Sequence, residues 1–433
     1  QGCLDRQLDM GRHNTKLVSG VYHLKITESE IGPVQNYIGR IYTLKIKTSK
    51  TIKALHRHVF LSNFDQGVIF IFLSFLVWDK TESMLTVALA FIIPAVVNTI
   101  IDYYFSSLSD KGNRVALIII GNIGSAVFLS CYGIFSSLYI LYIFIFFKSL
   151  FEKIYHTSLS PYFREVIPED KFKCFLAKIN MYGTIGASIG GFSLIYLYIY
   201  TQNITLIFIV SGLIELLSTL FLVSLRNEKQ KFKKEVESEI DITKLKRFTL
   251  IYSLEAFGIA LIINRFVIFL NDAHDLNIQN VGLVFFIVYG ISNLVAAEVY
   301  NLFSSFAVKF MLIFFFVLQA ILLVVMMSAN SLNLIIVMWF FFELVSNIAT
   351  IYTDDHINKT LFTNIGKSLS KFRIFISISG ILGQILIGTI WDIWGIGISF
   401  YFTGAILFLL AIIILFLKLQ TEEPIKTAID FEN

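Results

Sequence analysis

Residues 84–114 read MLTVALAFIIPAVVNTIIDYYFSSLSDKGNR, a long apolar run followed by a short polar and charged turn. An apolar run of about 20 residues is the length that a helix needs to cross a hydrocarbon core of ~30 Å. The pattern recurs along the chain, whose 433 residues are 56% hydrophobic and only 15% charged. Because a soluble domain carries about 25% charged residues, we expect an integral membrane protein.

The predicted transmembrane runs form two sets of six, separated by a charged segment. The runs are too long for the strands of a β-barrel and do not alternate in polarity. We therefore predict an all-α polytopic membrane protein with twelve transmembrane helices. The expected spans lie near 58–78, 84–105, 115–135, 138–158, 174–196 and 203–224, then 249–270, 281–302, 308–328, 332–352, 374–394 and 398–418.

The polar segments define the regions of the chain. Residues 1–56 are a basic N-terminal extension without an apolar core long enough for a signal peptide. Residues 226–247 are a charged linker between the two sets of spans, 57–225 and 248–420, and residues 421–433 are a tail. The cysteines Cys3, Cys131 and Cys174 are far apart, so we expect neither a disulfide framework nor a metal site.

Lysine and arginine fall on alternate loops, with Lys80 as the one exception. An excess of lysine and arginine in the loops on one side marks the cytoplasmic side of a membrane protein. We therefore expect a multi-pass protein of the cytoplasmic membrane with both termini in the cytosol. The basic loops carry Lys111 and Arg114; Arg164, Lys171 and Lys173; the linker 226–247; Lys309; and Lys359, Lys367, Lys371 and Arg373.

The turn at residues 106–114 resembles the loop signature of the major facilitator superfamily, Gly-x-Leu-x-Asp-Arg/Lys-x-Gly-Arg-Arg/Lys. Ser106 replaces the leading glycine. The matches are Leu108, Asp110 and Lys111, and, with a shift of one residue, Gly112 and Arg114. The resemblance implies two pseudo-symmetric six-helix bundles around a central path. It also implies a conformational latch that holds the outward-facing state, formed by Asp110, Lys111, Gly112 and Arg114 with Asp102 one turn earlier.

Other stretches are similar to efflux branches of this superfamily, including the macrolide-efflux type. They are Pro94 in the second span and EVIPED at residues 165–170. GTIWDIWG at residues 388–395 resembles the end of the family's eleventh helix. The fifth span lacks the Gly-Pro motif that drug/proton antiporters often carry, which weakens a specific antiporter assignment.

Few ionisable residues lie inside the predicted spans, where each costs several kcal/mol and usually faces protein or a water-filled cavity. They gather in spans one, four, seven and ten, the helices that line the central cavity in the fold that the loop resembles. We therefore expect a substrate or proton pathway, with internal ion pairing between helices as the alternative. The candidates are Asp65 with Asn63, Lys148, Glu152, Glu255, Arg265, and Glu343 with Asn347.

Roles for these candidates follow from their chemistry. Asp65, Glu255 and Glu343 are candidate proton acceptors. Lys148 and Glu152 are spaced i,i+4 and can pair on one helix face. Arg265 can pair with a carboxylate or hold an anionic group of a substrate.

We expect a secondary active transporter that moves a small solute by alternating access, with the proton as coupling ion. The chain has no GxxxxGK[ST] loop to bind a nucleotide, and no His, Asp or Glu cluster that would indicate a membrane enzyme. Export of a hydrophobic or amphipathic compound is the first hypothesis. A nutrient, peptide or lipid transporter, or a transporter-like receptor using residues 1–56, remains open. We expect a monomer in the bilayer, with no cofactor, metal or nucleic acid.

Overall fold

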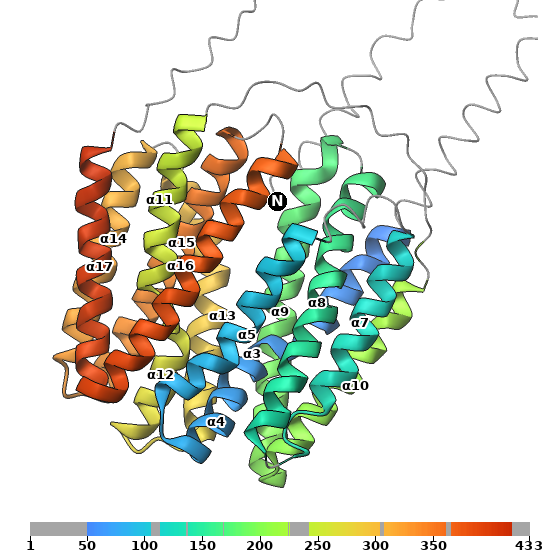
Figure 1. Ribbon diagram of the computed structural model, residues 1–433, viewed down its shortest axis with the longest axis horizontal. Coiled ribbons are helices and arrows are strands. Elements are labelled where there is room, and N and C mark those ends of the chain that lie inside the picture. The colour runs from blue at the N-terminus through green and yellow to red at the C-terminus, as the bar shows by residue number, and fades with distance from the viewer. Residues whose placement is uncertain are drawn as a thin grey trace, which may run out of the picture.

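The computed structural model describes residues 50–104, 113–135, 137–167, 169–223, 225, 242–303, 307–360 and 365–417. All regular structure within these ranges is helical. Figure 1 shows the N-terminal half, in blue to green, beside the C-terminal half, in yellow to red. The length of the apolar runs therefore predicts the secondary structure of the described chain.

The N-terminal half begins with a span that covers Lys50–Thr81 in consecutive pieces and starts inside the predicted extension 1–56. These pieces are a helix over 50–62, α3 (Phe64–Val68), the π-helix η1 (Ile69–Leu73) and α4 (Ser74–Thr81). The remaining helices are α5 (Met84–Tyr104), α7 (Arg114–Ser130), α8 (Leu138–Val166), α9 (Glu169–Thr201) and α10 (Ile204–Leu222).

The C-terminal half repeats this plan, again with a first span in pieces. Its helices are α11 (Ile242–Gly258) and α12 (Ile262–Asp272), which together form the seventh span, then α13 (Ile278–Phe303), α14 (Val308–Met327), α15 (Leu332–Thr360), α16 (Ile365–Trp394) and α17 (Ile396–Phe416).

Ten membrane spans in the described ranges are long and apolar enough to cross a bilayer. Two further helices complete the set: α7, which is apolar but 17 residues long, and α8, whose 29 residues include Lys148, Glu152 and Lys153. The described chain thus contains the twelve crossings that the sequence predicts. Since the number is even, residue 50 and Phe416 lie on the same side, which we call the terminal face. The opposite side, where α4 and α12 lie in Figure 1, is the far face.

The helices pack mainly within each half. In the first half α7 packs on α8 and α10, and in the second α14 packs on α15 and α17 while α11 packs on α16. Two long contacts join the halves, α5 with α16 and α9 with α13. The two halves therefore meet mainly along these two seams.

The seventh span is broken between its two helices, where Leu261 has a left-handed φ of 58°. A helix break inside a membrane leaves backbone carbonyls that other groups must satisfy. The Thr403 hydroxyl donates to Gly258 O at 3.0 Å, and Arg265 Nη2 lies 3.3 Å from Ala260 O. Side chains of α17 and α12 thus stabilise the break.

Candidate functional site

A cavity of about 450 Å³ lies between the halves. Most of its lining comes from the first half, and α13 contributes Tyr289 and Asn293 from the second. The lining extends from Asp65, near the middle of the first span, to Phe163 in the last turn of α8, so the cavity reaches towards the terminal face. This volume lies within the range of about 300–1,000 Å³ that small-molecule sites occupy.

Two carboxylates that line this cavity, those of Asp65 and Glu152, contact Lys148, which is not itself among the lining residues. Lys148 Nζ donates to Glu152 Oε2 at 2.8 Å, on the i,i+4 spacing that predicts their pairing, and lies 3.8 Å from Asp65 Oδ2. The Lys148 and Asp65 side chains are each 6% exposed. One turn further along α8, His156 Nε2 is 4.0 Å from the other oxygen of Glu152. These contacts join spans one and four through buried charge.

Glu215 of α10 also lines the cavity and is not among the site residues predicted from the sequence. Its side chain is buried, and its Oε2 has no hydrogen-bond partner among the described residues. Its backbone carbonyl accepts from Asn122 Nδ2, which also donates to Thr219 Oγ1 at 2.7 Å. The sequence signal was a single acid in the otherwise uncharged helix ITLIFIVSGLIELLSTLFL. The lining therefore includes three acids, Asp65, Glu152 and Glu215, and Lys148 behind it contacts the first two.

A neutral polar network supports the same helices. His58 is fully buried, and its ring nitrogens lie 2.6 Å from the Tyr155 hydroxyl and 3.2 Å from Ser218 O. Asn63, a predicted site residue, lines the cavity and donates from Nδ2 to Val59 O at 2.7 Å. These bonds fix the first span against α8 and α10 beside the acids.

The predicted residues of the second half are not among those that line the cavity. Glu343 is buried and accepts a hydrogen bond from Trp339 Nε1 at 3.2 Å, and Asn347 Nδ2 donates to Ser292 Oγ at 3.4 Å. Glu255 is also buried. The structure thus brings together Asp65, Asn63, Lys148 and Glu152, and places the acids of spans seven and ten elsewhere.

Arg265 is 0% exposed and contacts neutral groups of α17. Its Nη1 donates to Ser399 O at 2.7 Å and its Nη2 to Thr403 Oγ1 at 2.8 Å. The guanidinium carbon lies 4.9 Å from the centroid of the Phe400 ring, a cation–π distance. These contacts favour a role in holding the broken seventh span.

The predicted latch falls largely on residues that the structure does not describe. Asp110, Lys111 and Gly112 lie outside the described residues. Arg114 is the first residue of α7 and is buried, and Asp102 lies in the last turn of α5. The latch therefore stays a prediction.

The far face is closed by a contact between the halves that is not among the predictions from the sequence. The Asp392 carboxylate, near the end of α16, accepts from Ser83 Oγ and Met84 N at 2.7 Å each and from Leu85 N at 3.1 Å. A carboxylate at this position satisfies free N–H groups at the start of α5 and interacts favourably with its dipole. Gly388 permits the approach, since a Cβ there would lie 2.9 Å from Leu85 Cα.

Further contacts reinforce this closure. The Trp78 and Trp391 rings meet edge to face with centroids 6.2 Å apart, and Asn264 Nδ2 of α12 donates to Ser74 Oγ of α4 at 2.8 Å. The halves are thus joined at the far face, while the polar cavity extends towards the terminal face.

A model of the Major Facilitator Superfamily matches residues 59–359. No curated protein matches the sequence. Among solved structures, a mutant form of the nucleoside transporter NupG aligns with a TM-score of 0.70 and 13% identity, over 84% of this chain and 99% of that one.

Two further structures align at similar levels. A bacterial homologue of the human lysosomal transporter Spinster, in an inward-facing and occupied conformation, has a TM-score of 0.68 and 13% identity over 85% of this chain and 96% of that one. The human organic anion transporter MFSD10 has a TM-score of 0.63 and 10% identity over 85% and 99%. At these identities the likeness concerns the fold, and it confirms the predicted twelve-helix architecture.

Proposed function

We propose a mechanism for this chain, which belongs to the major facilitator superfamily, whose model covers residues 59–359. As a member of that family it is a multi-pass secondary transporter of a small solute and not an enzyme. It works by alternating access, with proton exchange at the cavity acids. The acids concerned are Asp65, Glu152 and Glu215.

Charge balance carries this proposal. Three buried or half-buried carboxyl groups surround the cavity, Lys148 is the ammonium group in contact with two of them, and His156 beside Glu152 adds a positive charge only when it is protonated. Leaving a buried charge without a partner costs several kcal/mol, so the cluster is stabilised when it takes up a proton or a cationic group. A substrate that enters or leaves this cavity changes that balance, which couples its movement to a proton.

The lining also limits the substrate class. Asn63, Asn180, Thr184, Tyr289 and Asn293 offer hydrogen-bond donors and acceptors around the acids. This chemistry favours a polar or amphipathic solute with donor or cationic groups over a purely hydrophobic one. An organic anion would face like charges, which cost free energy at short range.

The direction of transport is a separate proposal. Resemblance to efflux branches makes export of an amphipathic compound our first hypothesis, but the solved structures named above are nucleoside, Spinster-type and organic anion transporters and lend that branch no support. Uptake of a nutrient, or movement of a peptide or lipid, is the alternative. The basic loops favour a cytosolic terminal face, and on that orientation the arrangement corresponds to an inward-facing state.

Proteoliposomes test the coupling directly. Compounds that raise the thermal stability of the purified protein are added under an imposed pH gradient, and internal pH is followed with a dye. We expect substrate-dependent proton movement that Asp65→Asn and Glu215→Gln each reduce. Glu298→Gln, which removes an exposed acid of α13, is the matched control and should transport normally. Substrate flux that ignores the pH gradient and survives both cavity variants would reject proton exchange here.

The receptor alternative is tested by deleting residues 1–49, which leaves the first described helix whole. A transporter should retain flux after this deletion. The receptor would be favoured if neither the full chain nor the shortened chain transports substrate and the deletion abolishes a signal in the cytosol.

A further inference from the structure

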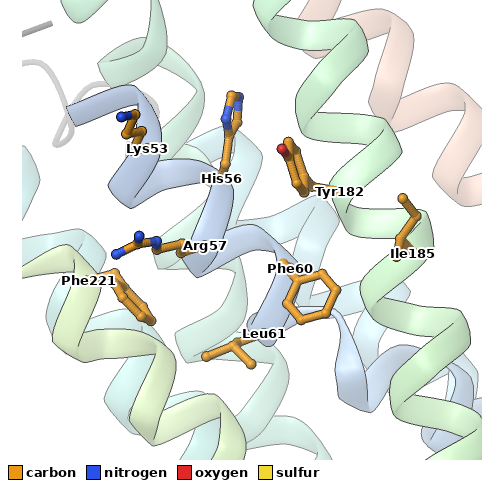
Figure 2. Close-up of a pocket in the computed structure, with 8 residues that line it drawn as sticks. All are labelled: Lys53, His56, Arg57, Phe60, Leu61, Tyr182, Ile185 and Phe221. Carbon is orange, nitrogen blue, oxygen red and sulfur yellow. The ribbon is translucent and has the colours of Figure 1, made fainter. Parts of the chain in front are cut away.

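A second cavity of about 540 Å³ lies near the terminal face, between helix 50–62, α9 and α10 (Figure 2). Helix 50–62 contributes to both cavities, yet the two share no lining residue, so the second one lies on another side of this helix. It is therefore separate from the proposed transport path. We refer to it as the basic groove.

The basic groove has cationic groups at one end and apolar groups at the other (Figure 2). Lys53 and Arg57 are exposed and lie towards the start of the helix, and Phe60 and Leu61 follow one turn further along. The Arg57 guanidinium carbon lies 5.9 Å from the centroid of the Phe221 ring of α10. Charge and apolar surface thus follow one another along the helix axis.

His56 adds an unsatisfied polar atom beside these cations. Its ring stacks on that of Tyr182, with centroids 4.7 Å apart, which fixes its orientation. Its buried Nε2 has no hydrogen-bond partner within the described part of the chain. Buried polar atoms normally have partners, so this nitrogen is an unsatisfied group next to the cations. Among the described residues that line the groove there is no Asp or Glu.

The depth of these groups matches the layers of a bilayer. At a rise of 1.5 Å per residue, Lys53 lies about 18 Å and Arg57 about 12 Å from Asp65 near the middle of the span. The half-thickness of a hydrocarbon core is ~15 Å, so Lys53 is at headgroup level and Arg57 can extend to it. Leu61 lies only about 6 Å from Asp65 by the same measure, well within the acyl layer.

We propose that the basic groove binds one anionic phospholipid. Its phosphate lies between Lys53 and Arg57 within reach of His56, and an acyl chain lies along Phe60, Leu61 and Phe221. Two cations with no acid between them suit an anionic headgroup, whereas the ammonium of a zwitterionic lipid would find no carboxylate in the lining. The inference holds for either orientation of the protein, because it concerns whichever leaflet meets the terminal face.

Native mass spectrometry of the full chain in detergent tests the proposal, with phosphatidylglycerol and phosphatidylcholine of identical acyl chains as probes. We expect the anionic lipid to bind more tightly. A Lys or Arg near a membrane surface strengthens such binding by roughly fivefold, so Arg57→Gln should weaken it by about that factor and the Lys53→Gln, Arg57→Gln pair by more. Lys80→Gln removes one cation at the far face and is the matched control, expected to bind normally.

A second variant tests the acyl chain. Ile185→Trp fills the apolar end of the groove without changing charge and should also weaken lipid binding. Equal binding of the two lipids, or an unchanged affinity in the double charge variant, would overturn the proposal. So would saturation by glycerol phosphate at the affinity of the whole lipid, which would indicate a site for a soluble anion, or full lipid binding by Ile185→Trp.

Discussion

The first and seventh spans hold corresponding places in the two halves, and each is built from more than one helical piece, yet their buried charges have different partners. In the first span Asp65 faces a cavity and lies 3.8 Å from Lys148 of α8. In the seventh, Arg265 bonds to the carbonyl of Ser399 and the hydroxyl of Thr403. One span directs its charge towards a cavity, and the other uses it to satisfy neutral groups.

The fourth and tenth spans repeat this difference. Lys148 and Glu152 of the fourth form an ion pair beside the cavity, whereas Glu343 of the tenth accepts from the indole of Trp339 one turn earlier. A similar distribution of charged residues therefore supports two kinds of local structure. We propose that the charge exchange of the transport cycle takes place in the first half, with Tyr289 and Asn293 of the second half completing the cavity wall.

The largest effect should come from removing the central cation. Lys148→Met leaves Asp65 and Glu152 without their partner, and breaking a buried pair in this way costs about 3 kcal/mol. We expect a clear fall in the thermal unfolding midpoint and loss of transport. Adding Asp65→Asn to Lys148→Met removes one uncompensated charge and should restore part of the stability. An unchanged midpoint in Lys148→Met would show that the cluster is not electrostatically coupled.

The next test compares acids of the two halves. An amide at Asp65 cannot take up or release the proton that the proposed exchange needs, so Asp65→Asn should reduce substrate-driven proton movement roughly tenfold or more. Glu343→Gln keeps an oxygen for Trp339 and lies outside the cavity lining, so it should reduce proton movement by less than about fivefold, the equivalent of about 1 kcal/mol. The measurement is internal pH in proteoliposomes at matched protein content. Equal losses in the two variants would remove the distinction between the halves.

The sequence predicted the crossings well because their length is set by the bilayer, but it did not predict the helix ends. Helix α8 continues to Val166 and α15 to Thr360, beyond the predicted 138–158 and 332–352. An apolar run measures the thickness of the hydrocarbon layer, whereas a helix can continue into water with polar residues.

The site was partly predictable for a similar reason. The i,i+4 spacing places Lys148 beside Glu152 on any helix, so local geometry is sufficient. Glu215 joins them through the packing of helices far apart in the chain, which spacing does not encode. The partners of Arg265 depend on a break in α11–α12 that the apolar sequence signals only through Gly258.

Substitution of Arg265 should lower stability and leave transport unaffected. Lysine keeps the charge but lacks the planar fork, so Arg265→Lys cannot satisfy Ser399 O, Ala260 O and Thr403 Oγ1 together. We expect a loss of about 1–2 kcal/mol in unfolding free energy, seen as a lower unfolding midpoint, with normal transport per folded molecule. Defective proton coupling at an unchanged unfolding midpoint would instead indicate that Arg265 acts in the transport path.

The smallest expected effect is a shift in the equilibrium between opening at the far face and opening at the terminal face. Asp392 caps α5 at the far face, and a lost cap costs about 1 kcal/mol, which shifts a two-state equilibrium about fivefold. Asp392→Ala should therefore favour opening at the far face, while Asp110→Ala, by weakening the predicted latch, should favour opening at the terminal face. The measurement is the labelling rate of Thr184→Cys, a cavity position, by an impermeant reagent applied at the terminal face of a variant without the native cysteines.

The labelling rate should fall with Asp392→Ala and rise with Asp110→Ala. Asp392→Asn keeps one acceptor oxygen, so its labelling rate should lie between those of Asp392→Ala and the parent. Asp79→Ala, another exposed acid at the far face, is the control and should leave the rate unchanged. Shifts in the same direction would mean that the two aspartates do not act on opposite ends of one equilibrium, and the closure at Asp392 would then stabilise the fold without biasing the transport cycle.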